Sequence, residues 1–234
     1  MKTSSAHLRK AGFTLVEMLT VLGIIAILIA LVAPALIDVV RSTRLNSAGD
    51  SLVNRITLAQ QSAVSLSSEV EMRFYRYADS TSDRPNDSAY YAYQVVQTLP
   101  NGTEKAVSDP YFLESGVILS PQAELSPLLE TAVGQEATPG GGSVVFNPPG
   151  DATSSDVSYA ALRFYPDGSM RMLTQNVADA ENQTAVALAY TIPPFNDSFL
   201  MVVESREVLN TQAPTNYYCI QIDSYTGRTR VYRP

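Results

Sequence analysis

The pattern of apolar and polar positions begins with one long apolar run. From Met18 to Ile37 the only polar side chain is that of Thr20. At 1.5 Å per residue this run spans about 30 Å as a helix, the thickness of the hydrocarbon core of a bilayer. A secretory signal peptide has a shorter apolar core followed by a small-residue cleavage site. The run therefore predicts a transmembrane helix, and the basic residues before it favour a cytoplasmic N-terminus and an exported body. These basic residues are Lys2, Arg9 and Lys10.

Beyond Ile37 the pattern becomes that of an amphipathic helix. Apolar residues recur every three or four positions, with polar residues between them. The apolar positions are Leu45, Ala48, Leu52, Ile56, Ala59, Ala63 and Leu66. One helix is therefore expected over residues 13–66, with a transmembrane part (13–37) and an amphipathic part (38–66) that lies on a folded surface. Pro34 removes a backbone hydrogen bond within it and is expected to kink or loosen it.

After residue 66 the period changes to that of strands. Val70, Met72 and Phe74 alternate with polar residues and tyrosine, as in a half-exposed strand. The turn at Asp167-Gly168 predicts a hairpin. Further strands are expected at 89–98, 111–119, 143–147, 160–165, 184–192, 199–204, 217–222 and 228–232. The fold class is therefore α+β: a long N-terminal helix packed on an antiparallel sheet in a β-rich body of residues 67–234.

Two segments of the body are expected to be loops. Residues 121–142 contain three prolines and end in three consecutive glycines. They are interpreted as an insertion that lies on the surface, with a short helix around Leu125, Leu128 and Leu129. A second loop carries Asp79, Asp83 and Asp87, whose spacing matches no calcium-binding loop, so a solvated loop is favoured.

Composition argues against catalysis. The sole histidine, His7, lies before the apolar run, and the single cysteine, Cys219, is expected to be a small buried residue of a strand. Neither a disulfide nor a Ser/His or Cys/His pair can form in the body. The neighbouring acids Glu69 and Glu71 are better explained as solvated strand residues than as a general acid and base. The sequence predicts a protein that is not an enzyme and has no cofactor and no metal site.

Charge also limits the partners. The chain has a formal charge of −7, and without its first twelve residues thirteen basic residues face 23 acidic ones, which gives −10. This acidity disfavours general binding to nucleic acid, which depends on many contacts between basic side chains and phosphates. It leaves room for one local basic site.

Glu17 is the only charged residue between Phe13 and Ile37. The stretch Gly12-Phe13-Thr14-Leu15-Val16-Glu17, after a short basic segment and before the apolar run, resembles the class III signal of type IV prepilins and type II secretion pseudopilins. The resemblance implies that residues 1–12 are a leader, that a prepilin peptidase cuts after Gly12, and that it methylates the new amine of Phe13. It also implies that Thr14, Glu17 and Pro34 serve assembly.

The resemblance gives Glu17 a physical role. A carboxylate at the edge of a bilayer costs a few kcal/mol unless it is paired. In a growing filament it would pair with the N-terminal amine of a neighbouring subunit; the alternative is a carboxylate that merely sits among lipid head groups. The implied partners are the peptidase, other pilin or pseudopilin subunits, an inner-membrane assembly platform and lipid around residues 13–37. The implied location is the bacterial inner membrane, in a single pass with a periplasmic body that is extracted into a filament.

Short segments of the body carry weaker resemblances. FLESGVIL, LRFYPDGSMR and CIQIDSYTGRTRVYRP resemble minor pseudopilin H and the FimT minor pilins, and more faintly the chain is similar to Verru_Chthon cassette protein D. The expected function is a minor pilin or pseudopilin that joins or primes a type II secretion pseudopilus or a type IV pilus-like filament.

The C-terminus offers an alternative function. Gly227-Arg228-Thr229-Arg230 resembles the tail of FimT-type pilins, which bind DNA during uptake. Contact with DNA through Arg228, Arg230, Tyr232 and Arg233 is therefore one interpretation. Arginines that protect the edge of a sheet are the favoured one, and a contact with another protein or with the filament is a third.

Overall fold

The computed structural model describes residues 13–78, 89–134, 144–149, 157–177 and 186–234. The chain divides into two compact units, Met1–Val40 and Arg41–Pro234. One helix, α1 (Leu15–Leu66), contributes to both units. Its backbone is helical through Pro34, and the kink expected at that residue stays a prediction.

The end of α1 is closed by its own backbone. Ser67 adopts a left-handed conformation with φ of 48°. The amide of Ser67 donates to the carbonyl of Val64 at 3.4 Å, and that of Ser68 donates to the carbonyl of Ala63 at 3.2 Å. This pair of bonds is the Schellman motif, which satisfies carbonyls that the last turn leaves without partners. The motif ends the helix and directs the chain into the first strand.

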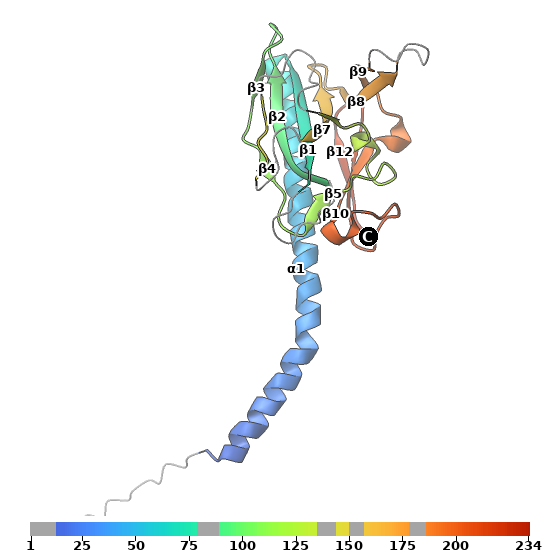
Figure 1. Ribbon diagram of the computed structural model, residues 1–234. Helices are drawn as coiled ribbons and strands as arrows, with labels where there is room; N and C mark the ends of the chain where they lie inside the picture. The colour runs from blue at the N-terminus through green and yellow to red at the C-terminus, as the bar shows by residue number, and fades with distance from the viewer. Residues whose placement is uncertain (1–12, 79–88, 135–143, 150–156, 178–185) are drawn as a thin grey trace, which may run out of the picture. The chain divides into compact units, whose positions relative to one another are not determined.

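The predicted amphipathic stripe is buried from Leu45 to Ala63, as the spacing requires. Leu66 departs from it and is 50% exposed, because the helix ends there. Figure 1 shows this part of α1 lying against the strands of the body. The helix thus forms one layer and the sheet the other.

The described strands form one antiparallel sheet (Figure 1). Its main path runs β12-β11-β10-β5-β2-β1-β7-β8-β9, with β3 and β4 paired to β2 and β6 paired to β7. The strands are β1 (Glu69–Tyr77), β2 (Ala89–Thr98), β3 (Glu104–Ala106), β4 (Tyr111–Phe112), β5 (Val117–Leu119), β6 (Val133–Gly134), β7 (Ser158–Phe164), β8 (Met170–Val177), β9 (Val186–Thr191), β10 (Phe199–Glu204), β11 (Tyr218–Ile222) and β12 (Thr229–Tyr232). The 3₁₀ helices η1 (Pro127–Leu129), η4 (Phe195–Asp197) and η5 (Ser205–Glu207) lie in the connections. The α+β fold class predicted from the sequence is confirmed.

The main core lies between α1 and the sheet. Met72 and Phe74 of β1, Leu162 of β7 and Ile220 of β11 join the stripe of α1 in one buried cluster. Burial of each such side chain stabilises the fold by roughly 1.5–3 kcal/mol. The alternation read in residues 70–74 therefore correctly identified the face of β1 that meets the helix.

The far face of the sheet is also covered, which the sequence analysis did not anticipate. A second buried cluster includes Tyr75, Tyr77, Tyr91 and Tyr159, with Phe146 stacked on Tyr75 at 4.0 Å between ring centroids. The prediction of a half-exposed strand at β1 was wrong, because tyrosine served as the outward residue and a connecting loop buries it.

Three further predictions need correction. The strand expected at 111–119 is split into β4 and β5 by a turn at Gly116, whose φ is +89°. Residues 144–147 form no strand, although Phe146 is buried. In the expected surface insertion, Leu125, Leu128 and Leu129 are buried rather than exposed, and Leu128 and Leu129 join the main core. The carbonyl of Leu129 accepts a hydrogen bond of 2.7 Å from the hydroxyl of Tyr90, which fixes that segment to the sheet.

Candidate functional site

The start of α1 is organised by a reciprocal pair of residues. The amide and hydroxyl of Thr14 donate to Oε2 of Glu17 at 3.1 and 3.2 Å. In return the amide of Glu17 donates to the Thr14 hydroxyl at 3.2 Å. This is a capping box, in which an N-cap threonine and the glutamate three residues later satisfy each other's backbone. Glu17 also places negative charge in the first turn, where the helix dipole favours it.

Only one carboxylate oxygen of Glu17 takes part in the capping box. Both bonds from Thr14 reach Oε2, and Oε1 has no hydrogen-bond partner among the described residues. The side chain is therefore held in place while half of its acceptor capacity stays open. The leader residues before Phe13, including Gly12, lie outside the described residues.

The helix that follows exposes an apolar surface around its whole circumference. Every side chain from Phe13 to Leu31 is exposed, including Leu15 at 80% and Leu31 at 72%. The helix is long and apolar enough to cross a membrane, and none of its most apolar window is buried. Leaving so much apolar surface in water is costly, at about 25 cal/mol per Å². The segment therefore requires lipid or other chains around it.

The C-terminal segment is tied to the amphipathic half of α1. Tyr218 donates a hydrogen bond of 2.6 Å to Asp50 on the helix. Arg233 stacks on the Tyr218 ring at 4.4 Å and reaches the same carboxylate at 2.7 Å. Gly49 makes room for this contact, because a Cβ there would lie 2.3 Å from a carbon of the Tyr218 ring. Arg233 therefore has a structural role in the body.

The other C-terminal candidates lie apart from Arg233. The register pairs Arg230 with Gln221 and Tyr232 with Cys219, so Arg230 and Tyr232 lie on the same face of the edge strand β12. The hydroxyl of Tyr232 donates to Gln221 at 3.2 Å. Arg228 precedes β12 and is exposed. The structure thus separates Arg233 from the residues expected to act with it.

The turn before β12 is fixed by close contacts. Gly227 has φ of 64°, and a Cβ there would lie 2.8 Å from the carbonyl oxygen of Gly168 in the β7–β8 turn. Gln60 of α1 donates to the carbonyl of Thr226 in the same turn. A glycine is therefore required at position 227 on both conformational and steric grounds.

A buried charge network crosses the far face of the sheet. Glu71 is 1% exposed and accepts hydrogen bonds from Arg73 at 3.0 Å, from Arg163 at 3.0 Å and from Tyr190 at 2.7 Å. Arg73 also pairs with Glu104, and Arg163 pairs with Glu69 at 2.7 Å. Interpreting Glu71 as a solvated strand residue was wrong, because it is buried and bound by Arg73 of its own strand and by side chains of β7 and β9.

The electrostatics of the network follow from its pairing. Burial by itself raises the pKa of Glu71, but Arg73 and Arg163 outweigh it, so the pKa lies below its ordinary value. The carboxylate stays charged and holds two guanidinium groups. Every charge is paired, so the network acts as a structural link between strands rather than as an acid or base.

Cys219 is 8% exposed on β11, and burial raises the pKa of its thiol to about 11. The described residues contain no group of three or more metal-ligating side chains. The aspartates considered for calcium, Asp79, Asp83 and Asp87, lie outside the described residues.

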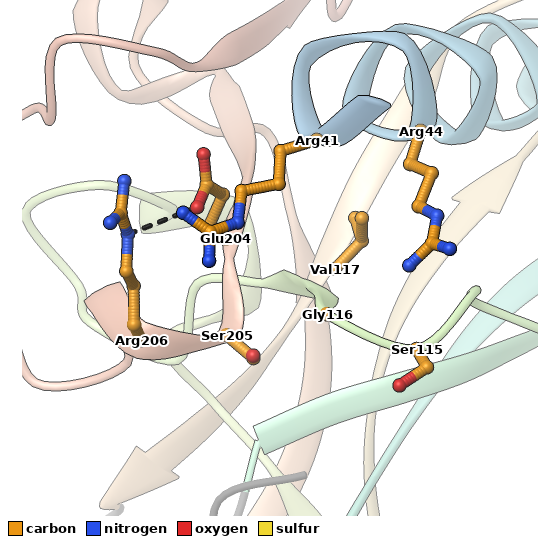
Figure 2. Close-up of a pocket in the computed structure, with 8 residues that line it drawn as sticks. All are labelled: Arg41, Arg44, Ser115, Gly116, Val117, Glu204, Ser205 and Arg206. Atoms are coloured by element: carbon orange, nitrogen blue, oxygen red, sulfur yellow. Dashed lines mark ion pairs between the residues drawn. The ribbon is translucent and has the colours of Figure 1, made fainter. Parts of the chain in front are cut away.

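One pocket of about 270 Å³ lies where α1 meets the strands β5 and β10 (Figure 2). Arg41 and Arg44 of the helix extend over it, and Arg206 lies across from them. Arg206 pairs with Glu204 at 3.0 Å and with Glu207 at 3.2 Å. The sequence analysis missed this pocket, because the three segments that line it lie more than seventy positions apart in the sequence.

Residues 7–33 match the family model described as the prokaryotic N-terminal methylation motif. The N-terminal segment therefore carries this methylation motif. This motif implies processing by prepilin peptidase, and it indicates a structural protein rather than an enzyme. The pilin-like N-terminus is consistent with a membrane-anchored protein.

The remaining comparisons concern the whole chain. No curated protein matches it. Among solved structures it is similar to the minor pseudopilin EpsH from the type 2 secretion system of Vibrio cholerae, with 9% identity and a TM-score of 0.39. The alignment covers 82% of this chain and 98% of that one. At this TM-score the likeness carries no argument about the body, whose architecture stands on its own contacts.

Proposed function

We propose that the chain is a minor pilin or pseudopilin-like subunit that joins or primes an envelope filament. In this proposal prepilin peptidase removes residues 1–12, cutting after Gly12, and methylates the amine of Phe13. The observation that carries it is the exposed apolar helix that overlaps the matched methylation motif. Such a surface needs partners that the chain itself does not supply, and lipid before assembly and neighbouring helices after it would provide them.

Processing is tested by intact mass in a host that has the peptidase. The expected product lacks residues 1–12 and has gained one methyl group on Phe13. A strain without the peptidase should retain the full chain in the membrane. The same processed N-terminus in both strains would refute the role of the peptidase.

Glu17 has two separable roles in this proposal. Its Oε2 closes the capping box with Thr14, while Oε1 is open to the methylated amine of Phe13 on a neighbouring subunit. The first role needs an acceptor oxygen, and the second needs a negative charge. Glu17→Gln keeps an amide oxygen for the capping box but removes the charge.

Filament incorporation of Glu17→Gln and Glu17→Ala separates the two roles. If charge pairing drives assembly, both variants lose incorporation to a similar extent. If the capping box alone matters, Glu17→Gln incorporates normally and only Glu17→Ala fails. Thr14→Ala is the matched control, because it removes the hydroxyl that makes two of the three capping-box hydrogen bonds and keeps the carboxylate. Normal incorporation of Glu17→Gln would overturn the pairing role.

A second candidate function is DNA binding by the exposed arginines of the C-terminus. Arg228 and Arg230 form no ion pair with any described residue, and Arg230 shares its face of β12 with Tyr232. Two observations argue against DNA binding. Asp223 lines the same small depression as Arg230, and Arg233 forms an ion pair with Asp50. A sheet edge protected by charge is the simpler function of these arginines.

A shift assay on the full chain in detergent tests DNA binding. Arg228→Ala and Arg230→Ala should each weaken binding and reduce its salt dependence, since phosphate contacts release counterions. Lys105→Ala, on the exposed strand β3, controls for loss of positive charge. Equal affinity in all variants would eliminate this function.

A further inference from the structure

We propose that the pocket between α1, β5 and β10 binds the phosphate of an anionic phospholipid head group. It is called here the arginine pocket, and its polar lining consists of Arg41, Arg44, Ser115, Glu204, Ser205 and Arg206. This proposal rests on the membrane anchoring of residues 13–37 given above. It extends the proposed function by assigning a lipid site to the body.

The lining has an excess of positive charge. Three arginines and one glutamate line it, and Arg206 is engaged by that glutamate and by Glu207. Glu204 is 8% exposed, pairs with Arg206 at 3.0 Å and accepts a hydrogen bond from Asn216 at 3.4 Å. Arg44 forms no ion pair or hydrogen bond with any described residue. Because the guanidinium of Arg44 has no carboxylate partner in the described part of the chain, it is suited to bind an external anion. Its planar fork matches the oxygens of a phosphate.

Neutral donors complete the lining. The hydroxyls of Ser115 and Ser205 have no hydrogen-bond partner within the described part of the chain. Figure 2 shows both side chains on the wall opposite the two helix arginines. The backbone keeps this wall in place, because the amide of Ser205 donates to the carbonyl of Gly116 at 2.9 Å. The positive φ of Gly116, +89°, forms the turn that brings the two serines together.

The position of the arginines along the sequence favours a lipid over a soluble phosphate. At 1.5 Å per helical residue, Arg41 follows Ile37 by about 6 Å and Arg44 follows it by about 10 Å. The head-group layer extends roughly 5–8 Å beyond each side of the hydrocarbon core. Arg41 therefore falls within this layer and Arg44 roughly 2–5 Å beyond it. Side chains on a helix tilt toward its N-terminus, which here is toward the apolar run, so the Arg44 side chain extends back toward the layer. Asp38, one turn before Arg41, carries the opposite charge but does not line the pocket.

The test uses the full chain, purified in a non-ionic detergent and titrated with short-chain phosphatidylglycerol or phosphatidylcholine. Bound lipid is counted by native mass spectrometry. We expect the chain to prefer phosphatidylglycerol. Arg44→Gln should weaken its binding about fivefold and Arg41→Gln/Arg44→Gln about 25-fold, as expected for basic residues at an anionic surface. Lys105→Gln, an exposed basic residue on β3 outside the pocket, should bind normally.

A second variant separates a built pocket from general surface charge. Ser115→Ala/Ser205→Ala keeps every charge and should still lower the affinity about tenfold, because hydrogen bonds to charged groups are strong. Unchanged binding by this variant, or an equal loss in Lys105→Gln, would overturn the pocket. Inorganic phosphate is the competitor, and displacement of lipid at equal concentration would instead indicate a site for free phosphate and refute the lipid proposal.

The assay needs neither cleavage nor assembly. A chain that binds phosphatidylglycerol but never enters a filament would refute only the proposed function. A chain that assembles normally and shows no lipid preference would refute only the lipid site.

Discussion

Gly49→Ala gives the sharpest test of how α1 meets the sheet, because two physical effects predict opposite signs. In a helix interior alanine is favoured over glycine by about 1 kcal/mol. On that ground alone the substitution should stabilise the protein. The structure predicts the reverse, since the added Cβ would lie 2.3, 2.4 and 2.5 Å from three ring carbons of Tyr218. No real Cβ tolerates such distances, so the ring or the helix must shift.

The magnitude follows from what a shift would disturb. Overpacking a filled site costs about 1–3 kcal/mol. Moving the ring also weakens the Tyr218 hydrogen bond to Asp50 and the stacked Arg233, at about 0.5–1.5 kcal/mol for a hydrogen bond. After the gain in helix propensity is subtracted, we expect a net loss of about 1–3 kcal/mol. For a protein of this size that lowers the melting temperature by roughly 3–10 °C.

The assay is thermal unfolding of the full chain in detergent, followed by near-ultraviolet circular dichroism of its tyrosines. Gly23→Ala is the matched control, because it makes the same change in the same helix where nothing lies within 4 Å of the new Cβ. It should leave the unfolding of the body unchanged. A Gly49→Ala protein as stable as the parent, or more stable, would refute the packing described for Tyr218.

Four further predictions concern the body. Glu71→Gln should lower the free energy of unfolding by about 3 kcal/mol, because it leaves the buried guanidinium of Arg73 and the half-buried one of Arg163 short of negative charge. Since the pKa of Glu71 is lowered, the difference from the parent in chemical unfolding should be full above about pH 4.5 and shrink below it. Phe146→Ala should cost about 3–5 kcal/mol, as for other buried aromatic rings, and urea unfolding measures it. Ser67→Gly should stabilise the protein by about 0.5–1 kcal/mol, because glycine adopts the left-handed conformation without a steric penalty. The thiol of Cys219, with its pKa raised to about 11, should react with an aromatic disulfide at pH 8 only after unfolding, and rapid labelling of the native chain would contradict its burial.

The sequence was most informative where one physical effect dominated. The stripe from Leu45 to Ala63 was predictable because helical periodicity and burial agree. The strand β1 was predictable because Val70, Met72 and Phe74 recur at every second position and are buried on the face toward the helix. The Thr14–Glu17 capping box has a sequence signature as well, a threonine three positions before a glutamate and at the start of an apolar run.

The remainder depended on contacts between distant residues. Tyrosine is compatible with both a solvated and a buried face, so the far-side cluster around Tyr75 and Phe146 could not be inferred from alternation. Glu71 appeared solvated because its partners Arg163 and Tyr190 lie 92 and 119 positions away. The arginine pocket required the pairing of β5 with β10 to bring Ser115 and Ser205 together with the helix.

The two halves of α1 explain why the function is indicated by the N-terminus and not by the body. In the amphipathic half, the apolar stripe joins the buried core beneath the sheet, and the polar neighbour Asp50 is paired within the chain. The residues of this stripe are Leu45, Ala48, Leu52, Ile56, Ala59 and Ala63. In the apolar half the side chains from Phe13 to Leu31 are exposed, and Oε1 of Glu17 has no partner among the described residues. A folded chain that satisfies one half internally and leaves the other uncovered needs lipid or further subunits to complete it. Substitutions in residues 13–31 should therefore change membrane retention or assembly while leaving the unfolding of the body unchanged, and substitutions such as Gly49→Ala should do the opposite.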